Sequence, residues 1–468
     1  MKKLAIVLMF STISLFATTS DTAVSPSSEE LNNITLQQAI EIVRKNNLEI
    51  HIADEEAKIK AFEAGMVSGK NWGKLDVSLT GLNSDDAGNV FGFKLQSREA
   101  TFGDFGFNEF DTSLMATPEG QQQLLGTAPE DLNNPEARSH YLTKLTYQIP
   151  IYTGGMLSAY GDITEALHKM SLMEREQIAA EKIYQTKKTF YDISLVESHI
   201  KNLSKIHDNI EKLENIVHMM IKEGYAKKVD LLEVQAKKSS VVRMLRQAEF
   251  NKELAYQFLS FLLNEKILSI VPIYTSAPMP EMSEEEILER NLDIRRAKLG
   301  HSITEYAVDA EFAKFLPTIG AFAEYGSGSE KPLDEFSDKA FYTVGVQATW
   351  NIFNGGSDSD AYQKAKAGNM KVAYQVELAK KGIALQISKI KTEIKSLDYE
   401  IKSLEKELAF ANEVYENYLG RYSEKLVSIN DVVIKQSIQI EKTLLLQEAK
   451  NKRNARVFEL EKISNGAN

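Results

Sequence analysis

The chain has 468 residues, carries a formal net charge of −11 at neutral pH and contains no cysteine. The missing cysteines exclude disulfides, thiol catalysis, cysteine metal sites and a lipid anchor on an N-terminal cysteine. Acidic and basic residues are spread along the chain rather than gathered in blocks, which argues against nucleic acid as a partner.

Residues 1–17 predict a secretory signal peptide. Lys2 and Lys3 supply the basic start, an apolar stretch follows, and Ala17 is a small residue at a position suited to cleavage. The stretch is shorter than the ~20 apolar residues of a membrane-spanning helix, so we favour export over an N-terminal anchor. No other stretch reaches that length, so a mature chain embedded in a membrane would have to use β-strands.

An internal repeat organises the rest of the chain. The segment IPIYTGG, which ends at Gly155, recurs as WNIFNGG, which ends at Gly356, at an offset of 201 residues. In both copies an Asp follows the second glycine after 75 residues, Asp230 in the first and Asp431 in the second. A distance kept without a gap predicts two copies of one structural plan.

Each copy contains a predicted helical hairpin. In the second copy, apolar residues recur at steps of three and four from Ile387 to Tyr418, which is the stripe of a coiled coil. A continuous helix of about 65 residues would be on the order of 100 Å long. Further helical runs at 231–263 and 432–463 predict the returning arms.

A shorter helix is predicted near the start of each copy, at 34–50 and 282–298, with Thr35 and Ser283 as N-cap candidates. Three prolines fall within 264–281, which predicts a non-helical linker there. The predicted organisation is therefore a signal peptide at 1–17, a first repeat at 18–263, a linker at 264–281 and a second repeat at 282–468.

Four segments alternate apolar and polar residues with the period of a β-strand: 75–80, 141–152, 317–325 and 341–353. Tyr141, Leu145 and Tyr147 fall on one face of the second segment, and Lys144 and Thr146 on the other. Such strands suit a barrel that faces lipid outside and water inside, although a half-buried soluble sheet shows the same alternation. Export and the long helices favour the membrane.

Four strands cannot close a barrel, and an open edge in lipid would leave backbone groups unpaired. Three chains of four strands would make twelve. The segments between the strands of each copy, 84–140 and 326–340, are polar enough to predict external loops.

The motifs YQIPIYTGG and TWNIFNGG, each followed by an Asp after the same distance, resemble the outer membrane efflux protein (TolC) family over essentially the whole mature chain. The stretch FGFKLQSREATFGDFGFNEFD at 91–111 also resembles a segment found in the first loop of some members. The fold class implied is mainly α with a β-barrel portion: long antiparallel coiled-coil helices forming a periplasmic α-barrel, with four transmembrane strands per chain and a 12-stranded barrel in a homotrimer.

The resemblance implies a passive exit duct of a tripartite efflux pump or type I secretion system, in the outer membrane of a Gram-negative bacterium and extending into the periplasm. Its implied partners are a periplasmic adaptor (membrane fusion) protein, an inner-membrane transporter and outer-membrane lipid. No cofactor and no enzymatic activity are implied. The sequence does not fix the cargo among small molecules, ions and polypeptides.

The family narrows the periplasmic end of its channel with a ring of carboxylates, which favours cations. The candidate gate residues are Asp192, Glu197, Glu393 and Asp398, paired as Asp192 with Glu393 and Glu197 with Asp398 by the repeat offset. Solvated acidic residues on a helix surface are the competing interpretation.

The predicted turns of the two hairpins, 222–230 and 422–431, are the candidate contact sites for the adaptor. Their candidate residues are Gly224, Lys227, Lys228, Lys425 and Asn430. Lys425 stands where the first copy has Gly224, so the second tip is expected to differ in shape or recognition. The candidate strand-to-helix turns are Gly154, Gly155, Gly355 and Gly356.

The main alternative is a periplasmic coiled-coil adaptor or structural protein, which would also be exported and rich in helical hairpins. An enzyme is not supported, because no nucleophile, base or metal cluster stands out. His199, His207 and His218 show no metal-ligand spacing and lie on a predicted helix with an apolar stripe.

Overall fold

The computed structural model describes residues 30–464, so the predicted signal peptide at 1–17 lies outside the described residues. The first half contains α1 (Leu36–Asn46), α2 (Leu48–Gly69), β1 (Lys74–Ser84), β2 (Arg138–Tyr152), α6 (Met156–Lys222) and α7 (Lys228–Leu263). The second half contains α8 (Glu284–Arg290), α9 (Leu292–Phe312), β3 (Thr318–Ser329), β4 (Ala340–Thr349), α10 (Ser357–Ser423) and α11 (Ile429–Ile463). The same order of elements therefore occurs twice.

The four strands form one antiparallel sheet in the order β1-β2-β3-β4. Its register aligns the alternating residues across strands, because Leu75 pairs with Tyr147, Tyr147 with Ala323, and Ala323 with Val344. One face is therefore mainly apolar across all four strands and the other is mainly polar. Within residues 30–464, β1 and β4 each pair with a strand on one side only.

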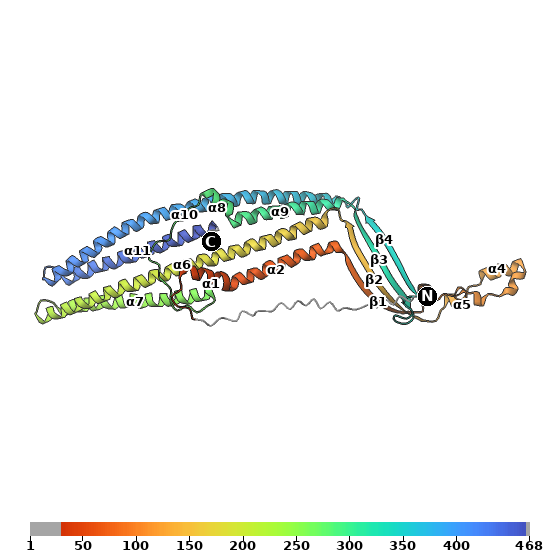
Figure 1. Cartoon of the computed structure of the whole chain (residues 1–468), viewed down its shortest axis with the longest axis horizontal. Coiled ribbons are helices and arrows are strands. Elements are labelled where there is room, and N and C mark those ends of the chain that lie inside the picture. Colours follow the sequence, from red (N-terminus) through yellow and green to blue (C-terminus); the bar gives the residue numbers. More distant parts are fainter. Residues whose placement is uncertain (1–29, 465–468) are drawn as a thin grey trace, which may run out of the picture.

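The helices extend from one end of the sheet, at an angle to the strands (Figure 1). α2 packs against α6, α6 against α9, and α9 against α10, which repeats the order of the strands to which these helices connect. Farther from the sheet, α7 pairs with α6 and α11 with α10 to make the two hairpins. α6 and α10 have 67 residues each, as the apolar spacing predicted.

The hairpins pack through the predicted apolar stripe. Ile387, Ile394 and Tyr415 of α10 are almost fully buried, and Leu213 and Val217 of α6 are buried as well. None of the helices in the described part of the chain is long and apolar enough to cross a membrane. The apolar side chains of these helices are buried by packing on neighbouring helices. Such tertiary packing provides most of the stability of helices in proteins.

The expected single helices at 34–50 and 282–298 are each broken in two, so this part of the prediction was wrong. The breaks fall at Asn47 and Asn291, whose extended ψ angles of 124° and 123° end one helix, and whose side chains cap the next. The Asn47 Oδ1 accepts a hydrogen bond from the Glu49 N–H at 3.0 Å, and the Asn291 Oδ1 accepts one from the Ile294 N–H at 3.0 Å. Asn favours N-cap positions because its short side chain reaches these amides.

The linker 264–281 is bound across the helices rather than hanging free. It forms parallel bridges with the first described residues, Leu31 to Ile267 and Ile34 to Ile270. Farther along, the Ile273 N–H donates to the Ser194 Oγ at 3.0 Å, so the linker is also fixed to α6.

The loop between β1 and β2 contains helices that the sequence analysis did not predict. They are α3 (Ala87–Gln96), α4 (Pro118–Gly126) and α5 (Glu130–Asn133). α4 and α5 project beyond the end of the sheet that is remote from the long helices, which we call the outer end (Figure 1).

Candidate functional surfaces

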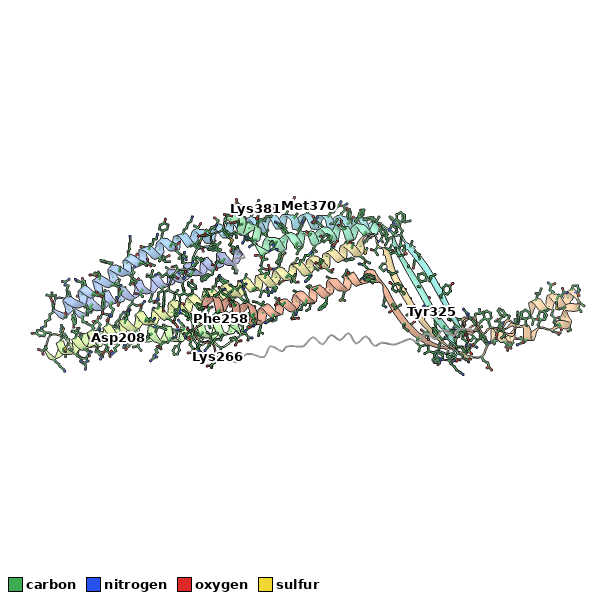
Figure 2. The ribbon with its side chains drawn as sticks, in the orientation of Figure 1. Asp208, Phe258, Lys266, Tyr325, Met370 and Lys381 are labelled. Atoms are coloured by element: carbon green, nitrogen blue, oxygen red, sulfur yellow. The ribbon has the colours of Figure 1, made fainter. Side chains whose placement is uncertain are left out.

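The apolar face of the sheet is exposed in the single chain. Val77 of β1 and Tyr342, Val344 and Val346 of β4 show two thirds or more of their surface, and Tyr325 of β3 lies in the same sheet (Figure 2). A monomeric soluble protein rarely exposes a continuous apolar surface of this kind. This face is therefore suited to an apolar environment.

Aromatic residues gather at the elbow where the sheet meets the helices. The chain contains two tryptophans, and both lie there: Trp72 is 79% exposed and Trp350 is 59% exposed. The Trp350 indole N–H donates to the Phe315 carbonyl at 3.0 Å, and the Tyr147 hydroxyl donates to the Trp72 carbonyl at 2.7 Å. Tryptophan and tyrosine are enriched where membrane meets water, so the elbow has the chemistry of that boundary.

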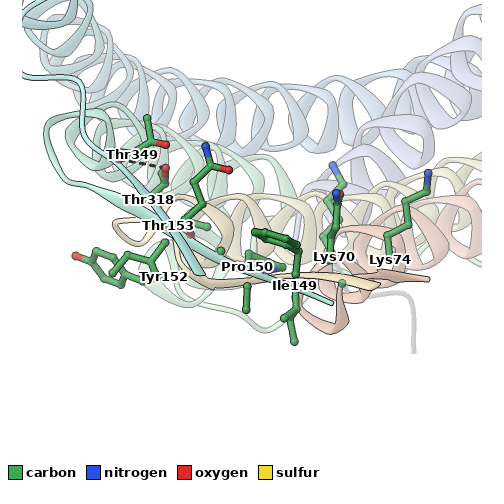
Figure 3. A pocket seen from close by; sticks show the side chains of 15 residues that line it. Lys70, Lys74, Ile149, Pro150, Tyr152, Thr153, Thr318 and Thr349 are labelled. Atoms are coloured by element: carbon green, nitrogen blue, oxygen red, sulfur yellow. Dashed lines mark hydrogen bonds between the residues drawn. The ribbon is translucent and has the colours of Figure 1, made fainter. Parts of the chain in front are cut away.

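The opposite face of the sheet carries charged and polar side chains. Lys144 and Glu324 form an ion pair at 2.9 Å across β2 and β3. Near the elbow a groove of about 550 Å³ opens on this face, with Lys70 and Lys74 projecting side by side along it and Thr318 opposite (Figure 3). This face is suited to contact with water.

The four glycines of the strand-to-helix turns have backbone conformations that favour glycine. Their φ angles are +66° and +91° at Gly154 and Gly155, and +58° and +84° at Gly355 and Gly356. A Cβ at Gly154 would also lie 2.7 Å from the carbonyl oxygen of Ala313. Glycine adopts positive φ at little energetic cost because it has no Cβ, so these turns redirect the chain from strand to long helix without strain.

The two hairpin tips have the same backbone geometry, so the expected difference in shape was wrong for the main chain. Gly224 has φ +82° and Lys425 has φ +66°. In both tips the next residue's N–H bonds back across the turn, from Tyr225 to the Met220 carbonyl at 2.8 Å and from Leu426 to the Arg421 carbonyl at 2.9 Å. These bonds end both helices in the same way, and the turn imposes a left-handed conformation even on a lysine.

The tips differ in their side chains instead. The Lys425 Nζ lies 3.3 Å from the centroid of the Tyr225 ring, a cation–π contact that joins the second tip to the first. Lys227, Lys228 and Asn430 are exposed on the two tips. The cation–π pair was missed by sequence reasoning, because nothing in the sequence places the two turns side by side.

Asp230 and Asp431 start the returning helices of both hairpins. The Asp230 carboxylate accepts from the Lys227 N–H at 2.7 Å, and the Asp431 carboxylate accepts from the Ser428 N–H at 3.1 Å. Both lie in the first turn, where a negative charge favours the helix dipole. This accounts for the repeated Asp without a role in binding.

The four candidate gate carboxylates each have a partner within the chain. Glu393 bonds to the Arg456 Nε at 2.7 Å, and Asp398 to the Arg453 Nε at 2.9 Å. Glu197 accepts from the Tyr256 hydroxyl at 3.1 Å. No ion pair or hydrogen bond joins one candidate to another among the described residues, and α11 supplies two basic partners that the sequence analysis did not identify.

Asp192 stands apart from the other three candidates. Burial raises the pKa of its carboxyl above the ordinary value, and Lys188, 3.4 Å away, only partly offsets this effect. Removing a carboxylate from water disfavours its charged form. Burial therefore disfavours the ionised form of Asp192.

One group of possible metal ligands appears in the described part of the chain. His207, Asp208 and Glu211 of α6 can bring three ligand atoms within 4.8 Å of one another. The carboxylates are exposed, and Glu211 already lies 3.4 Å from the Lys238 Nζ. Exposed acidic groups on helices commonly cluster without an ion, so we assign no site to them.

The fold is a four-stranded antiparallel sheet continued by long helical hairpins, and solved outer-membrane channels share it. The structure matches CusC with a TM-score of 0.76 at 13% identity, over 93% of each chain. It matches the CmeC outer membrane channel of Campylobacter jejuni with a TM-score of 0.74 at 15% identity, over 95% of this chain and 91% of the other. It matches the outer membrane protein VceC of Vibrio cholerae with a TM-score of 0.72 at 15% identity, over 92% and 95%.

Residues 285–463 match the family model described as outer membrane efflux protein. No curated protein matches the sequence significantly. The family resemblance inferred from the motifs is therefore confirmed over these residues.

Proposed function

We propose that the protein is the outer-membrane exit duct of a tripartite efflux pump or type I secretion system, a homotrimer that passes its cargo without bond chemistry. The observation that carries the proposal is the sheet, which is apolar and exposed on one face, polar on the other and unpaired at both edges in the described chain. Such a sheet is stable in lipid only when its edges are closed by further strands.

Apolar residues at both edges of the helical layer support closure by copies of the same chain. On α2 the exposed residues are Ile59, Phe62 and Met66, and on α10 they are Met370, Tyr374 and Leu378. Met370 lies on the outer surface of α10, far from α2 (Figure 2). Two different surfaces that meet head to tail generate a ring, and three copies of four strands give a 12-stranded barrel.

The periplasmic roles follow from the same arrangement. The hairpin tips, with Lys227, Lys228 and Asn430 exposed, are the surfaces that we assign to the adaptor. Asp192 and Glu393, together with Glu197 and Asp398, are our candidates for the lumenal gate. The recurring order of elements supports a duplication with its boundary at the linker 264–281, and it places equivalent surfaces twice in each chain.

The test is to express the chain in a Gram-negative host, isolate outer membranes and measure mass and conductance. We expect a trimer by mass in detergent and discrete channels that favour cations in a planar bilayer. Neutralising one ring pair, Asp192→Asn with Glu393→Gln or Glu197→Gln with Asp398→Asn, should raise conductance if the gate assignment holds. A soluble, non-conducting product would reject the duct and support the coiled-coil adaptor.

A further inference from the structure

The unexpected helix α3 lies on the polar face of the sheet at its outer end. The Phe93 ring stacks on the His140 ring of β2, with centroids 4.5 Å apart and planes 5° from parallel. The His140 Nε2 lies 2.9 Å from the Gln96 Oε1, and a Cβ at Gly328 of β3 would touch the His140 ring. His140 and Gly328 are on the same face as Lys144 and Glu324 because strand residues two or four apart share a face.

The chain that follows α3 is fastened to both sides of the sheet. Arg98 donates to the Ala340 carbonyl at 2.6 Å, at the start of β4. Glu99 lies between Arg138 of β2 and Lys339, and binds both. An ion pair to β2, an ion pair to the residue before β4 and a hydrogen bond to the first residue of β4 therefore hold α3 over the outermost residues of the sheet.

The helix turns a narrow, smooth surface away from the sheet. Val90 and Phe93 are buried, with Phe93 against His140 of β2, whereas Gly88, Gly92 and Leu95 are exposed on the other side. Residues spaced by four and three share one helix face. Two glycines on such a face allow another helix to approach closely.

The following step rests on the proposed trimer, in which the polar face lines the lumen. Twelve strands about 4.8 Å apart and tilted by about 40° enclose a barrel roughly 24 Å across between backbones. Three mutually touching helices, each about 10 Å thick, need a circle of roughly 22 Å. Three copies of α3 therefore fill the outer mouth almost completely.

We propose that the three α3 helices meet at the outer mouth of the duct and form a size-limiting restriction, with Gly88, Gly92 and Leu95 around its centre. The candidate gate carboxylates lie elsewhere, near the middle of α6 and α10. The restriction makes α3 a determinant of cargo size, and large cargo passes only when α3 leaves the polar face.

The absence of cysteine allows a clean test by single substitutions. Gly92→Cys is the probe, because no atom lies within 4 Å of the position that its Cβ would take. Gly126→Cys is the matched control, since it is equally unobstructed but lies on α4, which projects beyond the sheet. Both variants are purified as full-length assemblies, treated with a short bis-maleimide, and recorded in planar bilayers before and after a trimethylammonium methanethiosulfonate.

We expect cross-linked dimers and at least a twofold fall in conductance on thiol modification for Gly92→Cys, and neither for Gly126→Cys. A trimeric, conducting Gly92→Cys that neither cross-links nor responds to the reagent would overturn the restriction while leaving the duct intact. If the control is itself monomeric or non-conducting, the proposed duct fails and the restriction fails with it. Gly88→Cys replaces the probe if Gly92→Cys does not assemble.

Discussion

The buried amides that break the short helices give the sharpest prediction about stability. Asn291 is 3% exposed; its Oδ1 caps α9, and its Nδ2 donates to the Ile463 carbonyl at 3.0 Å, in the last turn of α11. Asn47 does the same in the first half, where its Nδ2 donates to the Leu262 carbonyl of α7 at 2.7 Å. One side chain thus joins the start of one helix to the end of another, twice in the molecule.

Asn291→Ala removes a helix cap, worth about 1 kcal/mol, and leaves a buried carbonyl without its donor, which costs about 1–3 kcal/mol. We therefore expect the free energy of unfolding to fall by about 2–4 kcal/mol. Asn291→Ser keeps a capping oxygen, but the shorter side chain cannot reach the Ile463 carbonyl. It should therefore lower the free energy of unfolding by less than Asn291→Ala does. The measurement is urea unfolding of the purified protein, followed by far-ultraviolet circular dichroism.

Asn46→Ala is the matched control because Asn46 precedes the first break and bonds only to a neighbouring side chain, Glu265, at 3.0 Å. We expect it to cost less than Asn291→Ala, because it removes one partly buried hydrogen bond and no helix cap. If Asn291→Ala costs no more than this control, the double role of the buried amide is refuted.

Gly224→Ala should lower the free energy of unfolding by about 1 kcal/mol in the same assay, because φ is +82° there. Lys425→Gly should raise the free energy of unfolding by up to about 1 kcal/mol, because it relieves the positive φ of Lys425, although loss of the contact with the Tyr225 ring reduces this gain. Asp192→Asn should stabilise the protein at pH 7: the raised pKa means that the ionised form opposes folding, so the gain in melting temperature should vanish below the ordinary carboxyl pKa of 3.8. Persistence of that gain at low pH would contradict the assignment. On the sheet, Leu145→Arg should cost about 2–4 kcal/mol and reduce the heat-modifiable outer-membrane form, whereas Thr146→Arg on the polar face should assemble normally.

Much of the fold could be predicted because it is local and repetitive. The steps of three and four along Ile387–Tyr418 predicted a helix that the structure extends over Ser357–Ser423. The breaks at Asn47 and Asn291 were missed, because an amphipathic pattern does not reveal a capping side chain whose second partner is more than 150 residues away. The candidate gate carboxylates Glu393 and Asp398 were found from the sequence, but their partners Arg456 and Arg453 come from another helix and were not.

The sequence by itself determined the two-copy plan, the long hairpins and the two chemically different faces of the sheet, since each depends on spacing along the chain. Only the tertiary structure decided that α3 covers the polar face, that Lys425 reaches Tyr225 and that the linker binds α6. These contacts join residues distant in sequence, so no periodic pattern encodes them. They depend on how the two halves pack, which is set by the sum of many side-chain contacts rather than by any local signal.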